Sequence, residues 1–145
     1  MTVKQLSVFA QNKPGRLSAL TGILAQNGVN IRAVSVADTS DFGILRLIVN
    51  DTEKAKDALT ANGILVKVTE VVGIEIPDKP GELSRALSVL DAEGINVEYL
   101  YAFISASGKG AYVAIRVEDN VAAESALTSA GFRTVTEKDV RGNKD

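Results

Sequence analysis

The segment "DKPGELSRALSVLDAEGINV", residues 78–97, is a second copy of "NKPGRLSALTGILAQNGVNI", residues 12–31. Both copies begin with a Lys-Pro-Gly turn and end with Gly-x-Asn, and the register between them is unbroken. After a shift of two residues the match resumes at Val49/Val117, Asp51/Asp119, Ala55/Ala123, the "ALT" segments 58–60 and 126–128, and Gly63/Gly131. A turn repeated by chance would not carry the rest of the alignment, so the sequence indicates a duplicated domain.

Each copy predicts the element order β-α-β-β-α-β. In the first copy, apolar residues at 17, 20 and 24 recur with helical spacing, and Gly28 follows where a left-handed helix cap is expected. Strands are expected at 5–10, 29–37, 42–50 and 64–72, with Leu45, Leu47 and Val49 on one face. The second helix is expected to be capped by Asp51 or Thr52, to turn Ala55, Ala58 and Leu59 inward, and to end at Gly63.

The second copy shows the same pattern. Leu83, Ala86, Leu87 and Leu90 form an amphipathic helical stripe, and a second helix is expected at 120–130. Strands are expected at 95–104, 111–118 and 132–140. We therefore predict two domains, residues 1–70 and 71–140, followed by a disordered tail at 141–145 that has no apolar anchor.

Composition narrows the classes of function. The 145 residues are 46% hydrophobic and 23% charged, which is typical of a globular protein. A formal net charge of −2 argues against nucleic-acid binding, and neither a membrane span nor a secretion signal is visible, so we predict a cytoplasmic protein. The chain has no Cys and no His, which excludes disulfides, Cys/His zinc sites and Ser-His-Asp catalysis. We predict no metal, no cofactor and no enzymatic activity.

A β-α-β-β-α-β unit that opens with [N/D]-K-P-G-x-L-S and continues with G-[V/I]-N-[I/V] after its helix resembles the ACT domain. The resemblance covers essentially the whole chain as two domains in tandem. It implies an α+β fold of two ferredoxin-like units, each an antiparallel sheet with helices on one face. It further implies that the strand after the first helix lies at a sheet edge, and that units pair edge to edge with amino-acid effectors at the seam. No catalytic domain is attached, so any regulated enzyme would be a separate polypeptide.

The repeated turn has the chemistry to bind a zwitterion. Pro14 and Pro80 fix φ, and the glycines that follow leave the backbone accessible. The N–H groups and positive dipole end of the next helix favour a carboxylate, while Asn12 and Asp78 can accept hydrogen bonds from an ammonium group. The alternative is an ordinary Pro-Gly turn in which Asn or Asp forms a local turn or a helix cap.

The candidate ligand-binding residues belong to the two turns and to the start of the strand after each first helix. They are Asn12, Lys13, Pro14, Gly15, Arg16, Leu17, Asn30 and Ile31 in the first copy, and Asp78, Lys79, Pro80, Gly81, Glu82, Leu83, Asn96 and Val97 in the second. For Leu17 and Leu83 we favour core packing, with only their backbone N–H groups near a ligand. Ile31 and Val97 are expected to point inward, and the two asparagines either open a strand or act across the seam. Arg16 and Glu82 differ in charge, which predicts two sites of unequal affinity unless both charges are merely solvated.

These features support three hypotheses of function. The first is a stand-alone regulator or sensor of amino-acid metabolism that binds an amino acid and forms a homodimer. The alternative is a ligand-independent regulatory subunit that resembles the small subunit of acetolactate synthase; the aromatic residues Tyr99, Tyr101 and Phe103, on one strand face, suit either packing against another sheet or an ordinary core. An enzyme using Asp78, Glu82, Glu75 or Glu98 has no supporting motif.

Overall fold

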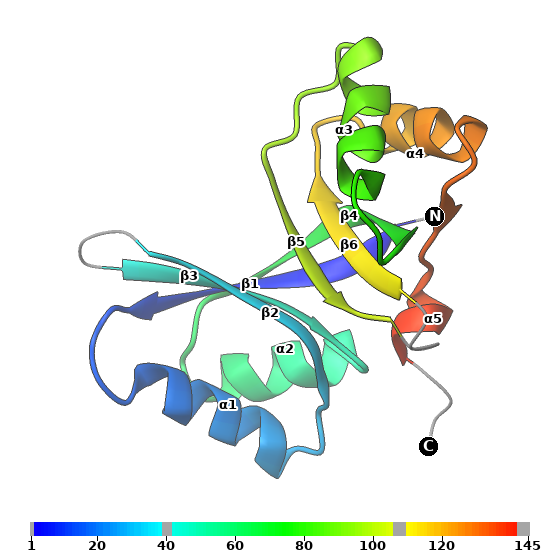
Figure 1. Cartoon of the computed structure of the whole chain (residues 1–145). Helices are drawn as coiled ribbons and strands as arrows, with labels where there is room; N and C mark the ends of the chain where they lie inside the picture. The colour runs from blue at the N-terminus through cyan, green and yellow to red at the C-terminus, as the bar shows by residue number, and fades with distance from the viewer. Residues whose placement is uncertain (1, 39–41, 106–109, 142–145) are drawn as a thin grey trace. The chain divides into compact units, whose positions relative to one another are not determined.

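The computed structural model describes residues 2–38, 42–105 and 110–141 (Figure 1). The chain forms two compact units. Lys4–Thr69 make up the N-terminal unit, and Val3 together with the residues from Glu70 onward makes up the C-terminal unit. One strand, β4 (Val66–Pro77), begins in the first unit and continues in the second.

The N-terminal unit has the predicted element order. Its elements are β1 (Val3–Gln11), α1 (Arg16–Gln26), β2 (Ile31–Asp38), β3 (Phe42–Val49), α2 (Thr52–Ala61) and the start of β4. The strand order is β2-β3-β1-β4, so that β2 lies at an edge, and β3 is antiparallel to both β1 and β2. The implied edge position of the strand after the first helix is confirmed in this unit.

The core of the N-terminal unit lies between its sheet and its two helices, which cover the same face of the sheet in Figure 1. Strand alternation turns Leu45, Leu47 and Val49 toward the helices, as predicted. The carboxylate of Asp51 accepts a hydrogen bond from the Lys54 backbone N–H at 3.2 Å, which confirms the predicted cap of α2. The residues predicted to face inward from α2, namely Ala55, Ala58 and Leu59, are buried.

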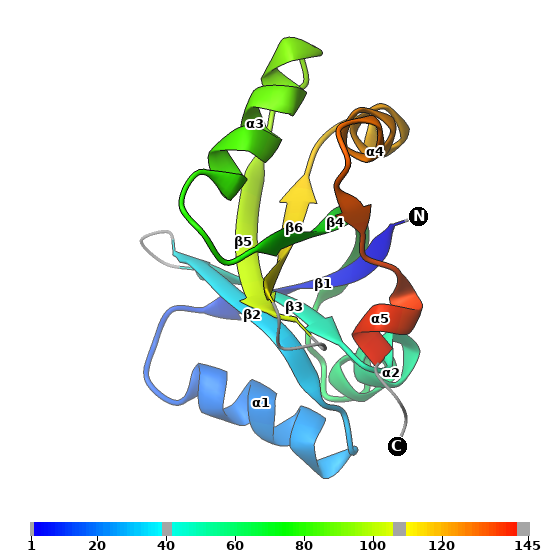
Figure 2. The same cartoon turned by 45° about the vertical axis from the view of Figure 1, so that its right-hand side comes forward.

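The C-terminal unit repeats this arrangement (Figure 2). Its elements are the rest of β4, α3 (Glu82–Ala92), β5 (Tyr99–Ile104), β6 (Gly110–Arg116), α4 (Asn120–Ser129), β7 (Arg133–Thr134) and α5 (Glu137–Arg141). Strand β6 pairs antiparallel with β4 and β5, and β7 pairs with β4. Strand β5 therefore occupies the edge that β2 occupies in the first unit. Ala86 and Leu90 of α3 are fully buried in the core.

The end of the chain differs from the expectation. The predicted strand at 132–140 is wrong, because only Arg133–Thr134 are extended and α5 follows. Thr136 and Asp139 form a reciprocal cap: the Asp139 carboxylate accepts from the Thr136 N–H at 2.8 Å, and the Asp139 N–H donates to the Thr136 hydroxyl at 3.3 Å. Such a pair three residues apart starts a helix rather than continuing a strand. Arg141 ends α5, and residues 142–145 lie outside the described part of the chain. The strand predicted at 95–104 begins only at Tyr99.

Candidate functional site

Each Pro-Gly turn places a left-handed glycine directly before a helix. Gly15 has a φ of 86° before α1, and Gly81 has a φ of 90° before α3. An L side chain is strained in this region of conformational space, so the backbone itself requires glycine at both positions. A Cβ atom built on either glycine would meet no described heavy atom within 4 Å. The outer side of each turn is therefore open.

The two helices that follow these glycines start without a side-chain cap, whereas Asp51 caps α2 and Asp119 caps α4. The interpretation of Asn12 and Asp78 as helix caps is therefore wrong. The first N–H groups of a helix have no acceptor within the helix. In α1 and α3 the second and third helical residues thus present their N–H groups at the open side of the turn; these residues are Leu17, Ser18, Leu83 and Ser84.

Backbone hydrogen bonds hold both turns in the same shape. The Lys13 N–H donates to the Gln11 carbonyl at 3.0 Å, and the Arg16 N–H donates to the Lys13 carbonyl at 3.3 Å. The equivalent bonds of the second turn, from Lys79 to Pro77 and from Glu82 to Lys79, measure 3.0 and 3.5 Å. Because these bonds close both loops, the helix starts are pre-organised before any ligand arrives.

Asn12 and Asp78 lie exposed at the mouths of the two turns. Neither side chain has a hydrogen-bond partner among the residues that the structure describes. Asn12 lines a hollow of about 90 Å³ between the first turn and strands β2 and β3, which we call the loop hollow. Ligand pockets usually measure roughly 300–1,000 Å³. The loop hollow can therefore hold the head group of an amino acid but not the whole molecule.

The predicted core positions of Leu17 and Leu83 are wrong, because these side chains are 45% and 37% exposed. The core-facing stripe of α1 begins one turn later, at the buried Leu20. Leu17 and Val36 of the edge strand β2 line the same hollow, and Val36 is itself half exposed. No other element of the described chain therefore covers Leu17 or Val36. Leu17 lines the loop hollow, and Leu83 lines a separate hollow along α3.

The asparagines at the other end of the two helices are not part of the turns. Helices α1 and α3 have 11 residues each, so Asn30 and Asn96 lie about 16 Å along the helix axis from the turn of their own unit. The Asn30 N–H donates to the Asn50 side chain at 2.8 Å, which fixes the entry into β2. Ile31 and Val97 pack against the two cores, and their inward direction is confirmed.

The charges at the two turns differ in their surroundings. The Arg16 guanidinium donates to the Gln11 side-chain oxygen at 3.1 Å, and no carboxylate lies within ion-pair distance of it in the described ranges. Glu82, by contrast, forms an ion pair of 3.4 Å with Arg85, one turn along the same helix. Such exposed pairs contribute little to stability, but the pair partly neutralises Glu82.

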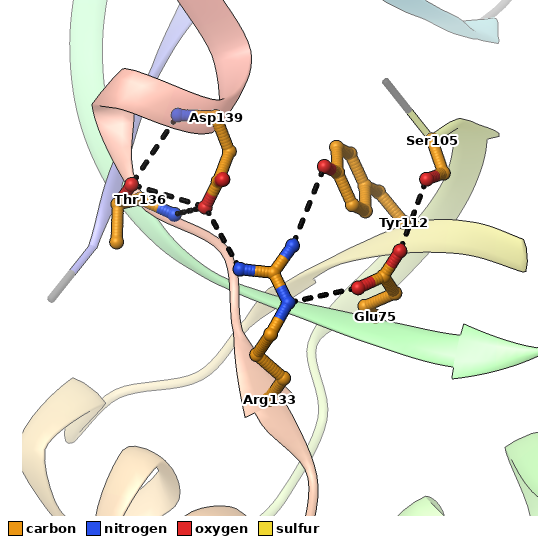
Figure 3. A network of polar contacts seen from close by, with 6 residues as sticks. All are labelled: Glu75, Ser105, Tyr112, Arg133, Thr136 and Asp139. Atoms are coloured by element: carbon orange, nitrogen blue, oxygen red, sulfur yellow. Dashed lines mark hydrogen bonds and ion pairs between the residues drawn. The ribbon is translucent and has the colours of Figure 1, made fainter. Parts of the chain in front are cut away.

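A polar network in the C-terminal unit has no counterpart in the prediction (Figure 3). Arg133 of β7 lies between Glu75 of β4 and Asp139 of α5, at 2.8 and 3.3 Å. Ser105 donates to the other Glu75 oxygen at 3.0 Å. Glu75, a candidate acid in the enzyme hypothesis, is thus held by partners that explain its position. A comparison of the two copies could have pointed to this network. Glu75 and Arg133 are charged, whereas the equivalent residues of the first copy are the apolar Phe9 and Leu65.

The network shifts the pKa values of two of its members. The hydrogen bond to Glu75 raises the pKa of Arg133 above its ordinary value, and the nearby Asp139 charge adds to this effect. Burial alone would raise the pKa of Asp139, but hydrogen bonds from the Thr136 N–H and hydroxyl, together with Arg133, outweigh it and lower that pKa. The ionised form of Asp139 is therefore the one that holds α5.

Protonation of Asp139 at low pH should weaken the contacts of its carboxylate with Thr136 and Arg133. A carboxylate with a lowered pKa stabilises the fold fully above its unfolded pKa of about 4, and the contribution is lost as the pH falls through the lower folded value. We expect Asp139→Asn to be less stable than the wild type near neutral pH and the difference to shrink as the pH falls below about 4. Urea unfolding across this pH range measures the difference, and a difference independent of pH would contradict the assignment.

In the described part of the chain, no helix has the length and apolar character needed to span a membrane. Over the same residues, no group of three or more potential side-chain ligands is placed to hold a metal ion.

Comparison with known proteins identifies the architecture. The family model for the ACT domain pair matches residues 1–142. A search of curated proteins finds no significant match. Among solved structures, protein BT0572 from Bacteroides thetaiotaomicron is 40% identical, with 97% of this chain and 96% of that chain covered and a TM-score of 0.91.

Two more distant structures share the fold. The regulatory subunit of aspartate kinase from Thermus thermophilus, in its ligand-free form, is 18% identical, with 88% of this chain and 92% of that chain covered and a TM-score of 0.64. E. coli aspartokinase III in complex with lysine and aspartate is 17% identical, with 88% and 31% covered and a TM-score of 0.53. The predicted architecture, two ferredoxin-like ACT units in tandem, is confirmed.

Proposed function

Because the chain belongs to the ACT domain pair family, we propose that it is a non-catalytic regulator or sensor of amino-acid metabolism that binds a small amino acid at its Pro-Gly turns. The observation that supports this most is the pair of uncapped helix starts, each opened by a left-handed glycine with free space beside it. An α-carboxylate would accept hydrogen bonds from the N–H groups of Leu17 and Ser18, or of Leu83 and Ser84. The α-ammonium group would donate to Asn12 or Asp78.

The size of the loop hollow bears on how the ligand is enclosed. About 90 Å³ is too small for a complete amino acid, so another ACT unit would have to supply a second wall. The edge strands β2 and β5 offer surfaces for this purpose. Val34 and Val36 on β2 are 54% and 50% exposed, which is unusual for two valines on one strand and favours pairing with a second copy. We therefore propose a homodimer in which effector binding tightens the seam and biases a separate metabolic enzyme.

Two of the solved structures that share the fold are consistent with this role. One is a regulatory subunit of aspartate kinase, and the other is an aspartokinase in complex with lysine and aspartate. The second candidate function is a ligand-independent regulatory subunit for a separate catalytic chain. The exposed valines of β2 would suit such a partner as well as a second copy of this chain. A ligand screen separates the two functions.

A thermal-shift screen with the twenty amino acids tests the proposal. An effector at about 100 times its dissociation constant should stabilise the protein by about 2.7 kcal/mol and raise the melting temperature visibly. Asn12→Ala should reduce the shift at the first site and Asp78→Ala at the second, because each removes an acceptor for the ammonium group. Calorimetry should then resolve two unequal affinities, since Arg16 and Glu82 differ in charge.

The matched control is Asn27→Ala, at the opposite end of α1, where the side chain donates to the Ile23 carbonyl at 2.8 Å. This variant should keep the full ligand-induced shift. If no amino acid raises the melting temperature, effector binding is wrong and the ligand-independent subunit is favoured. Two equal sites in calorimetry would contradict the part of the proposal that rests on charge.

A further inference from the structure

Both units have a groove at the equivalent place, on the flank of the first helix that faces the fourth strand. In the N-terminal unit the groove measures about 480 Å³; we call it the flank groove. Its apolar wall is formed by Phe9, Ala19, Leu20, Ile23, Ile64 and Leu65. The loop hollow opens on the other flank of α1, toward β2 and β3, but the two hollows adjoin, because Ala10, Gln11 and Arg16 line both of them.

The two copies differ in charge around this groove at three equivalent positions. Phe9, Ala19 and Leu65 of the N-terminal unit correspond to Glu75, Arg85 and Arg133 of the C-terminal unit. Three apolar residues in the lining of one groove are therefore charged in the other. The two grooves are formed by equivalent backbone segments. Because the side chains differ at all three positions, we expect the grooves to bind different ligands.

In the C-terminal unit each of these three charged side chains has a partner. The guanidinium carbon of Arg85 lies 4.0 Å from the centroid of the Phe132 ring, and Arg85 also donates to the Ala130 carbonyl at 3.1 Å. Arg133 bonds Glu75 at 2.8 Å, as Figure 3 shows. The side chain of Arg85 thus lies against Phe132 in the lining of the C-terminal groove, which measures about 580 Å³, whereas the first copy has only the methyl group of Ala19 at this position.

In the N-terminal unit the groove keeps apolar surface in contact with water. Phe9 is 40% exposed and Leu65 is 68% exposed, whereas Leu20 is buried. Arg16 is the only cationic residue in the lining of the groove, and no carboxylate pairs with it among the described residues. An apolar surface beside one unpaired guanidinium matches a ligand with an apolar body and a single negative charge.

We propose that the flank groove binds a small branched aliphatic monocarboxylate, with the aliphatic body against Leu20, Ile23 and Ile64 and the carboxylate on Arg16. The volume is within the usual range for small-ligand sites. No acceptor for an ammonium group is needed, so the ligand differs in kind from the amino acid proposed for the Pro-Gly turns, although Arg16 lines both hollows and the two ligands would compete for it. The equivalent groove of the C-terminal unit is expected not to bind the same ligand, because Glu82 stands there at the position of Arg16 and would repel a carboxylate.

The test is a titration of the isotope-labelled full chain with 4-methylpentanoate, followed by amide NMR. The amide signals of Ile23, Ile64 and Leu65 should shift saturably. The neutral analogue 4-methylpentanamide should bind about tenfold more weakly, because it loses the charge-assisted hydrogen bonds to Arg16. Arg16→Gln should weaken binding of the carboxylate by a similar factor.

Ala19→Glu is the decisive variant, because a carboxylate three residues from Arg16 on the same helix can pair with the guanidinium and repel the carboxylate of the ligand. Ala19 is exposed on α1 and glutamate is a good helix former, so the variant should fold normally, which circular dichroism checks. It should abolish the shifts, whereas the matched variant Arg85→Ala should leave them intact. The proposal is overturned if the carboxylate gives no saturable shift at millimolar concentration, if the amide binds equally well, if Ala19→Glu binds as the wild type does, or if the shifts fall at Leu17 and Ser18 instead. A failed amino-acid screen would leave these results unaffected.

Discussion

Leu24→Ala and Leu90→Ala are each expected to lower the free energy of unfolding by about 3 kcal/mol. The two residues occupy the same position of the repeat, one on α1 and one on α3, and both are fully buried. Truncation removes apolar contacts and leaves a cavity between helix and sheet that the close-packed core can only partly fill. Urea unfolding measures the loss, and hydrogen exchange should locate each loss in the unit that carries the substitution.

The matched controls are Leu17→Ala and Leu83→Ala, two turns earlier on the same helices. Their side chains are substantially exposed, so each substitution should cost less than about 1 kcal/mol. The sequence pattern alone predicts equal costs at all four positions, because it assigns all four leucines to the core. A cost at Leu17 as large as the cost at Leu24 would contradict the exposed position of the turn leucines.

Gly110→Ala is expected to destabilise the C-terminal unit by about 2–3 kcal/mol. Gly110 begins β6 opposite Pro77, and a Cβ atom there would overlap the backbone carbonyl of Ile76. A side chain could rotate away, but this carbonyl belongs to β4, so the end of the β4–β6 ladder would have to separate. The midpoint of urea unfolding reports the cost.

Gly43→Ala provides the comparison within a strand of the other unit. A Cβ atom at Gly43 would lie 3.7 Å from its nearest neighbour, the Ala37 carbonyl oxygen, which is an ordinary contact. The reduced freedom of the unfolded chain should make this change neutral or slightly stabilising. Equal losses at Gly43 and Gly110 would show that lost glycine flexibility, rather than steric overlap, determines the effect.

The repeat made most of the fold predictable. Apolar spacing located Leu45, Leu47 and Val49 in the core, and the position before a helix made Asp51 one of two candidate caps, of which the structure shows Asp51 to be the cap. Both features depend on local sequence and on strand or helix periodicity. The exposure of Leu17 was not predictable in this way, because periodicity assigns a helix face but does not say where the covering layer ends.

The candidate site was predictable to a similar extent. The Pro-Gly turns and the unpaired N–H groups at the helix starts follow from a motif of a few residues, whereas the left-handed φ of the two glycines and the absence of a side-chain cap come from the structure. The hydrogen bond of the Asn30 N–H to Asn50 and the Arg133 network depend on pairings between residues far apart in the chain, for which helical and strand patterns carry no signal. The Thr136–Asp139 cap was visible in the sequence, but the strand pattern of the first copy concealed it.

Amide NMR of the chain titrated with the amino acid that the thermal screen identifies is the most direct test of binding at the Pro-Gly turns. Hydrogen bonds from the uncapped helix starts to a carboxylate should produce the largest saturable shifts at Leu17, Ser18, Leu83 and Ser84. Saturable shifts elsewhere, with these four N–H signals unmoved, would contradict the proposed site.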